Sequence, residues 1–305
     1  MNTMKKQLIT LACCLLVCLP VWAQKQYKVA APSGKLYLNL NGVRIEGYTG
    51  NEVIFSSQGV PDEGDERAKG LQVLSGSGLI DNTGLGISVT TKGSDIEVNH
   101  VGRTTLGDVL SIRVPNTVDV VFNNNTATFA DTVLIKDMKG ELEISSSYND
   151  IVLVNNSGPM NVKNLYSNVE VTFADDIKGP VSIVSVYGLV DVAMPTATKA
   201  SLMMSTSYGK LYAARDFDVL INNTSAKKER VDNAGGEGID SILPDVVVGN
   251  GQVVVSSASS SKRKRLTAAG IVDFGLGESI EGTINGGGID LILQSTYKNV
   301  YLRAN

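Results

Sequence analysis

The side chains of this chain that could carry chemistry are few, and the most regular of them are tyrosines. Tyr148, Tyr166, Tyr187 and Tyr208 recur at intervals of 18, 21 and 21 residues, and Tyr297 stands in the same pattern near the end of the sequence. A tyrosine joins a flat apolar ring to a hydroxyl group, so a row of exposed tyrosines could stack on sugar rings. Tyrosine is also frequent in strands, so the row can equally pack the edge of a core, and we favour that interpretation.

An acidic pair, Asp175 and Asp176, is the second candidate, and Lys178 stands close to it in the sequence. Glycosidases cleave sugars with clustered carboxylates, and a basic side chain commonly stands beside the carboxylates of such solenoid enzymes. Neighbouring residues of a strand point to opposite faces, so the two carboxylates converge only at a turn. The pair follows Phe173 and precedes Gly179-Pro180, which favours a solvated corner over a catalytic site.

Other catalytic and metal-binding patterns are weak in the sequence. His100 is the only histidine, which excludes a histidine-rich metal site and nearly excludes a Ser-His-Asp hydrolase. Residues 235–242 match a calcium-binding repeat, but the motif occurs once, whereas such sites need consecutive copies that hold each ion between neighbouring turns. We therefore expect no enzymatic activity, no metal and no cofactor.

The first residues are typical of an export signal. Lys5 and Lys6 give a positive start, residues 8–19 form an apolar run, and residues 21–23 form a small-residue cleavage site. The apolar run is shorter than the about 20 residues that a membrane-spanning helix needs. We predict a signal peptide over residues 1–23 and a periplasmic, outer-surface or secreted mature chain without a transmembrane segment.

Cysteine content and charge narrow the class of protein further. The three cysteines, Cys13, Cys14 and Cys18, all lie within the predicted signal, so the mature chain can form no disulfide and must be held by burial and strand pairing. Lys and Arg number 27, two of them in the signal, against 31 Asp and Glu. This acidic balance argues against nucleic acid as a partner.

Short strands are the elements that must position the tyrosines. Apolar residues stand six and four positions before each tyrosine and three and five positions after it, as Leu142, Ile144, Ile151 and Leu153 do around Tyr148. Alternation with a period of two predicts strands with one buried face. A small polar residue stands two positions before each tyrosine, and these residues are Ser146, Asn164, Ser185, Thr206 and Ser295.

One unit is therefore a strand, a corner, a second strand and a second corner, and it cannot bury its own apolar face. Stacked units bury that face and pair each strand with those above and below. At about 20 residues a turn, the repeat predicts an all-β fold, namely a β-solenoid similar to a single-stranded β-helix, with irregular insertions at both ends. A twisted β-sandwich of meanders remains the alternative. We predict a leader over residues 24–34 and one repeat-built domain over 35–305.

The same register extends beyond the four central copies. Gly42 and Gly93 take the place of the tyrosine in residues 36–45 and 87–98. The last copy, residues 291–302 around Tyr297, ends three residues before the end of the chain. We expect this last copy to close the stack.

Three stretches carry a resemblance to a known family. They are KLYLNLNGVRIEGYTGNEVIFSS (35–57), KGPVSIVSVYGLVDVAMP (178–195) and TINGGGIDLILQSTYKNVYLR (283–303). They resemble the bacterial cell-envelope "putative adhesin" domains, a family of unknown function built from short repeated strands. The resemblance covers the chain from Lys35 to the end, and it implies a β-solenoid-like secreted or periplasmic protein without established enzymatic residues.

The sequence thus predicts a non-enzymatic secreted or envelope protein that presents a β-surface for adhesion or scaffolding. The alternative is a carbohydrate-binding or polysaccharide-cleaving β-solenoid that uses the tyrosines or the acidic pair. In either case the expected partner is a protein or glycan of the cell surface or envelope, and its identity stays open. The exposure of the tyrosine rings is the observation that bears most directly on the choice.

Overall fold

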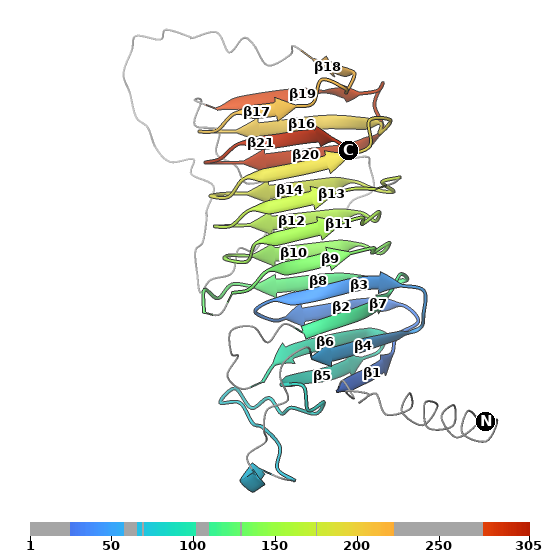
Figure 1. The fold of residues 1–305 in the computed structure, drawn as a ribbon, viewed down its shortest axis with the longest axis vertical. Coiled ribbons are helices and arrows are strands. Elements are labelled where there is room, and N and C mark those ends of the chain that lie inside the picture. The colour runs from blue at the N-terminus through green and yellow to red at the C-terminus, as the bar shows by residue number, and fades with distance from the viewer. Residues whose placement is uncertain are drawn as a thin grey trace, which may run out of the picture.

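The computed structural model describes residues 25–57, 66–68, 70–101, 110–128, 130–174, 176–222 and 277–305. Over these residues the protein is all-β, and its only helical element is the short 3-10 helix η1 (Glu66–Ala68). The strands form two large mixed sheets that run the length of the molecule (Figure 1). The predicted all-β class is confirmed. No helix in this part of the chain is long and apolar enough to cross a membrane.

The two sheets contain ten and eleven of the described strands. The spatial order in the first is β1 (Gln26–Ala30), β4 (Glu52–Ser57), β7 (Leu110–Pro115), β3 (Val43–Tyr48), β9 (Val133–Lys136), β11 (Ile151–Val154), β13 (Val169–Thr172), β15 (Val190–Met194), β21 (Val300–Ala304) and β17 (Leu211–Ala213). The order in the second is β18 (Val219–Ile221), β19 (Glu278–Ile284), β16 (Ala200–Thr206), β20 (Ile289–Ser295), β14 (Val181–Ser185), β12 (Met160–Asn164), β10 (Leu142–Ser146), β8 (Val118–Asn124), β2 (Gly34–Asn39), β6 (Asp95–His100) and β5 (Ile87–Lys92).

The repeating structural unit is a rung, which we define as one strand of the eleven-stranded sheet, a corner and one strand of the ten-stranded sheet. Rungs β10–β11, β12–β13 and β14–β15 stack in chain order, and their strands pair in parallel. Residues at the same offset from the tyrosine lie opposite one another, so that Leu142 faces Met160 and Met160 faces Val181. The period of the sequence is therefore the register of the stack.

The core lies between the two sheets and consists of the inward-facing residues of successive rungs. Ile144, Val162 and Ile183 are at most 1% exposed and lie one above another. Full burial of such a side chain stabilises the fold by about 1.5–3 kcal/mol. Neighbouring rungs supply this burial for each other, because one rung alone leaves its inner face open.

The last rung of the chain does not close the stack. Rung β20–β21 lies between β14–β15 and β16–β17, and its strands pair in parallel with both neighbours. Figure 1 shows these strands, red at the C-terminal end of the colour scale, among yellow strands from much earlier in the chain. The expectation that residues 291–302 form the terminal rung is wrong, because β16, β18 and β19 lie beyond them in the eleven-stranded sheet.

The first rung is placed in the same way at the opposite end. Rung β2–β3 lies between β6–β7 and β8–β9, and it again pairs in parallel on both sides. Its corner is shorter than predicted. Val43, and not Ile45, lies opposite Val133, the residue that also faces Ile151. The alignment of Gly42 with the tyrosine position therefore holds for the strand before the corner and fails for the strand after it.

The copy around Gly93 is a hairpin and not a rung. β5 and β6 pair antiparallel within one sheet, and Gly93 occupies the turn between them with a φ of 64°. This positive φ suits glycine, which has no Cβ to clash with the backbone. Both a hairpin and a rung alternate apolar residues with a period of two, so the sequence pattern did not separate them.

Antiparallel strands lie at both ends of the parallel stack. At one end these are β1, β4 and β5, and β1 falls within the stretch predicted as a leader. At the other end β19 pairs antiparallel with both β16 and β18. The parallel part of the eleven-stranded sheet is thus flanked by antiparallel pairs at both ends, whereas the ten-stranded sheet ends in parallel β17 on one side.

Candidate functional site

The tyrosine corner is built on a buried polar side chain. The small polar residue two positions before each tyrosine is at most 5% exposed. In rung β14–β15, Ser185 Oγ accepts a hydrogen bond from the Gly188 N–H at 3.0 Å and donates one to the Ser167 carbonyl of the neighbouring rung at 3.0 Å. The Ser185 hydroxyl therefore stabilises the corner of its own rung and joins that corner to the corner of the neighbouring rung β12–β13.

The same two bonds recur in the following rungs. Ser295 Oγ accepts from the Lys298 N–H at 3.0 Å and donates to the Gly188 carbonyl at 2.8 Å. Thr206 Oγ1 accepts from the Gly209 N–H at 2.9 Å and donates to the Lys298 carbonyl at 3.0 Å. A buried backbone group without a partner is costly, so a small hydroxyl that both donates and accepts suits this position in these three rungs, whereas Asn164 in the same position only donates, through its Nδ2.

Outside this line of hydrogen bonds the five tyrosine rings form one continuous stack, which we call the tyrosine ladder. Ring centroids are 4.7 Å apart for Tyr148–Tyr166, 5.1 Å for Tyr166–Tyr187, 4.7 Å for Tyr187–Tyr297 and 5.0 Å for Tyr297–Tyr208. The ring planes diverge by 15° or less. These spacings follow the separation of neighbouring strands, about 4.8 Å, because each rung contributes one ring.

The ladder presents ring edges to solvent, while its ring faces cover one another. Tyr148, Tyr166, Tyr187 and Tyr297 are 40–46% exposed, and Tyr208, the ring at one end, is 58% exposed. A sugar that stacks on tyrosine needs an uncovered ring face. Inside the ladder both faces of each ring lie against neighbouring rings, so only the terminal rings, Tyr148 and Tyr208, have an outer face that no ladder ring covers.

The order of the rings differs from their order in the sequence. Tyr297 lies between Tyr187 and Tyr208, which follow each other in the chain. This position alters the acidity of its hydroxyl. The pKa of Tyr297 is raised above its ordinary value, first by repulsion from the charge of an ionised Tyr187 and then by partial burial and by Tyr208. The ladder therefore disfavours the phenolate form of Tyr297.

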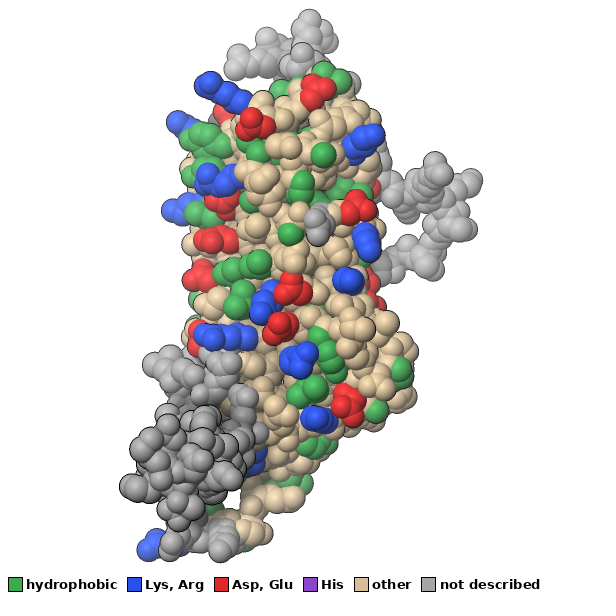
Figure 2. Space-filling view, turned by 45° about the vertical axis from the view of Figure 1, so that its right-hand side comes forward, with side chains coloured by type: hydrophobic (Ala, Val, Ile, Leu, Met, Phe, Trp, Pro, Cys, Tyr) green, Lys and Arg blue, Asp and Glu red, His purple; other side chains and the backbone are tan. Residues whose placement is uncertain are grey.

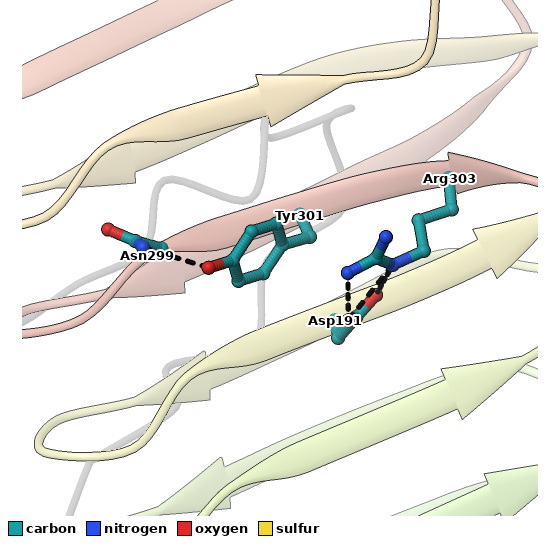
Figure 3. Close-up of polar contacts among 4 residues, drawn as sticks. All are labelled: Asp191, Asn299, Tyr301 and Arg303. Atoms are coloured by element: carbon teal, nitrogen blue, oxygen red, sulfur yellow. Dashed lines mark hydrogen bonds and ion pairs between the residues drawn. The ribbon is translucent and has the colours of Figure 1, made fainter.

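A second, shorter stack of rings was missed by the sequence analysis. Tyr212 and Tyr301 stack at 5.1 Å and 8° on the outer face of the ten-stranded sheet. Each stands four positions after a ladder tyrosine, Tyr208 or Tyr297, and that shared offset is the signal that would have revealed the pair. Tyr301 Oη accepts a hydrogen bond from Asn299 Nδ2 at 2.8 Å (Figure 3).

A charged pair lies next to this second stack and joins two rungs. Arg303 Nε and Nη2 donate to the carboxylate of Asp191 at 2.7–3.0 Å, and Figure 3 shows the pair bridging β21 and β15. The Arg303 guanidinium also lies 5.1 Å from the Tyr301 ring centroid. The pKa of Arg303 is raised by its hydrogen bonds and charge attraction to Asp191. The bridge ties the last rung to a rung more than a hundred residues earlier in the chain.

The face seen in Figure 2 intersperses charges of both signs along the length of the stack, with hydrophobic side chains in small groups. An open hollow on the surface has a volume of about 250 Å³. Its lining residues are Tyr37, Asn39, Lys92, Asp95 and Glu97. Lys92 and Glu97 form an ion pair there at 2.8 Å. Tyr37 lies outside the tyrosine ladder, so this hollow is separate from it.

Of the predicted acidic pair, the structure describes only Asp176. Asp176 is exposed, and Asp175 lies outside the described residues, as do residues 235–242 with the calcium-like motif. His100 ends β6 opposite Ile87 of the hairpin. Across the part of the chain that the structure describes, there is no group of three or more His, Cys, Asp or Glu side chains arranged to hold a metal ion.

Comparison with known proteins gives two solved structures of similar shape. One is a "putative cell adhesion protein" from Clostridium sporogenes ATCC 15579, with 11% identity, a TM-score of 0.37, and coverage of 92% of this chain and 100% of that one. The other is a "putative adhesin" from Bacteroides fragilis NCTC 9343, with 9% identity, a TM-score of 0.28, and coverage of 94% and 99%. No family model and no curated protein matches the chain.

Proposed function

We propose that this protein is a non-enzymatic, exported β-solenoid that presents a long β-surface for adhesion or scaffolding. The observation that carries the proposal is the tyrosine ladder, in which each of five rungs sets the same side chain at the same corner, 4.7–5.1 Å from the next. A surface that repeats along one axis suits an extended partner, such as a polymer or another regular protein surface. It suits a small substrate less, because no rung differs enough from its neighbours to be a unique site.

Co-sedimentation with envelope fragments of the cells that export the protein tests this proposal. We expect the purified chain to pellet with untreated fragments. Loss of binding after protease treatment of the fragments identifies a protein partner, and loss after periodate oxidation identifies a glycan. A chain that stays in the supernatant with all envelope and extracellular-matrix preparations would contradict an adhesive or scaffolding role.

Carbohydrate binding is the second candidate, and the exposure of the rings favours it. Because the ring faces inside the ladder are covered, the sugar would stack on an end of the ladder, and Tyr208 is the most exposed ring at 58%. We expect Tyr208→Ser to weaken any signal on a glycan array more than Tyr166→Ser does, because Tyr208 is the most exposed end ring, although Tyr148 at the other end remains. Equal loss in the two variants would show that the sugar does not use the end ring.

Polysaccharide cleavage by Asp175 and Asp176 is the weaker form of the same alternative. Asp176 is exposed to solvent, whereas a carboxylate that acts as a general acid usually has its pKa raised by burial. We expect the purified chain to release no reducing ends from envelope polysaccharides. Release that disappears in an Asp175→Asn, Asp176→Asn variant would overturn the non-enzymatic assignment.

A further inference from the structure

The C-terminal rung β20–β21 is inserted between two rungs that are consecutive in the sequence, β14–β15 and β16–β17. Without it, these two rungs could pair with each other. Val181 of β14 and Leu202 of β16 both lie opposite Leu291 of β20. If the C-terminal rung were absent, β14 and β16 could pair directly with Val181 opposite Leu202. That step repeats the register of Met160 opposite Val181 in the rung before. The rung is therefore an inserted unit whose removal leaves two matching surfaces.

The contacts that hold this rung in place join segments remote in the sequence. Ser295 Oγ donates to the Gly188 carbonyl at 2.8 Å, and the Lys210 N–H donates to Asn299 Oδ1 at 2.9 Å. Tyr297 stacks on two ladder rings, and Arg303 pairs with Asp191. Each of these interactions requires the C-terminal rung. The same rung from a second copy of the chain would make the same contacts.

We propose that residues 277–305 are exchanged between two copies of this chain, so that each copy supplies β19 and the C-terminal rung β20–β21 of the other. Exchange of an identical element keeps the contacts that this element makes in the closed monomer, and its main free-energy cost is the association of two molecules. Reciprocal exchange gives a closed dimer with two complete ladders. The proposal concerns how the stack is assembled and is independent of what the surface binds.

The shared register also suggests a pathway to exchange. During folding β14 and β16 can pair with each other first, and they then have to separate again to admit β20. An open slot between two matching rungs accepts the C-terminal segment of any nearby copy. At high protein concentration a second copy competes with the chain's own segment for that slot.

Disulfide trapping between two differently tagged chains tests the exchange. Ala193 of β15 lies opposite Arg303 of β21 on one side and opposite Thr172 of β13 on the other. In a background with Cys13, Cys14 and Cys18 changed to serine, chains with Ala193→Cys and chains with Arg303→Cys are mixed, unfolded, refolded together and oxidised. Chains with Ala193→Cys mixed with Thr172→Cys chains form the matched control, because β13 and β15 are consecutive in the sequence.

We expect about tenfold more disulfide-linked dimer from the Ala193→Cys and Arg303→Cys mixture than from the control mixture, and each variant refolded alone should give only the background level. Equal yields in the two mixtures, or no linked dimer in either, would overturn the proposal. A single chain with both Ala193→Cys and Arg303→Cys verifies the geometry. If the thiols of that chain do not join, the position of the C-terminal rung is wrong and the proposal fails with it.

Discussion

The middle of the stack and its two ends are made of the same rung, but the chain reaches them in different ways. From β10 to β15 each rung follows its spatial neighbour in the sequence. At the ends, β2–β3 and β20–β21 are each inserted between rungs from other parts of the chain. The corner hydrogen bonds and the ring stacking continue through the C-terminal insertion without interruption.

This difference shows which information each part of the repeat carries. Alternation fixes the face that a strand buries, and the small polar residue fixes the corner. Neither determines which rungs lie next to each other in the stack, because every rung presents nearly the same strand edges to the rungs on both sides. Insertion places β2–β3 and β20–β21 inside the stack, and the sheets end in β1, β17, β18 and β5. The variants described next compare the inserted C-terminal rung with the consecutive middle.

The largest effect is expected from truncation of the core. Ile183 in the middle and Leu293 in the inserted rung are both fully buried and lie opposite each other. We expect Ile183→Ala and Leu293→Ala each to lower the free energy of unfolding by about 2–5 kcal/mol in urea titrations. Lys163→Ala, at an exposed position, serves as the control and should stay within about 0.5 kcal/mol. A loss of less than about 1 kcal/mol for Leu293→Ala would show that the last rung is not part of the core.

Removal of the buried corner hydroxyl is expected to have the next largest effect. Ser185→Ala and Ser295→Ala each leave a backbone N–H and a carbonyl without their partner, so each should lower the free energy of unfolding by about 1–3 kcal/mol. Replacement by threonine, which occupies this position as Thr206, should recover part of the loss. If alanine left the stability unchanged at both sites, the corner hydrogen bonds would not explain why a small polar residue occupies this position.

The rings allow a finer comparison between an end ring and an interior ring of the ladder. Tyr148 stacks on one ladder ring, whereas Tyr297 stacks on two. Each stacked pair contributes about 0.5–1.5 kcal/mol beyond its buried area, so Tyr297→Leu should destabilise the chain roughly twice as much as Tyr148→Leu in the same urea titration. Equal losses would mean that Tyr297 does not bridge Tyr187 and Tyr208.

The smallest effect is a dependence of stability on alkaline pH. The pKa of Tyr297 is raised in the folded chain, mainly by Tyr187, above the value of about 10 that it has when unfolded. The folded state therefore retains a proton that the unfolded state has lost, and stability falls as the pH rises above about 10 and through the folded pKa. Phenolate absorbance should show Tyr297 ionising late, and Tyr297→Phe should weaken the loss of stability. A loss of the same size in that variant would contradict the assignment.

The sequence predicted the middle of the molecule well, because its physical determinants are local. Leu142 and Ile144 are buried as the alternation requires, and Ser185 makes the corner bonds that its size and hydroxyl allow. The position of Tyr297 could not be predicted, since β14 and β16 have the same register against β20 and nothing in their alternation excludes a direct pairing with each other. The Gly93 hairpin was mistaken for a rung because strand alternation is the same in parallel and antiparallel pairs. The Tyr212–Tyr301 pair was overlooked, although its offset from the ladder is visible in the sequence.

The order of the rungs is the central claim, and disulfide formation within one chain tests it most directly. Asp191 faces Tyr301, and Tyr301 in turn faces Tyr212. In the cysteine-free background, Asp191→Cys with Tyr301→Cys should oxidise readily. Asp191→Cys with Tyr212→Cys should not, because two strand spacings, about 9.6 Å, exceed the about 7 Å that a disulfide can bridge. Rapid oxidation of the Asp191→Cys, Tyr212→Cys chain would show that the rungs stack in chain order and would contradict the insertion of the C-terminal rung.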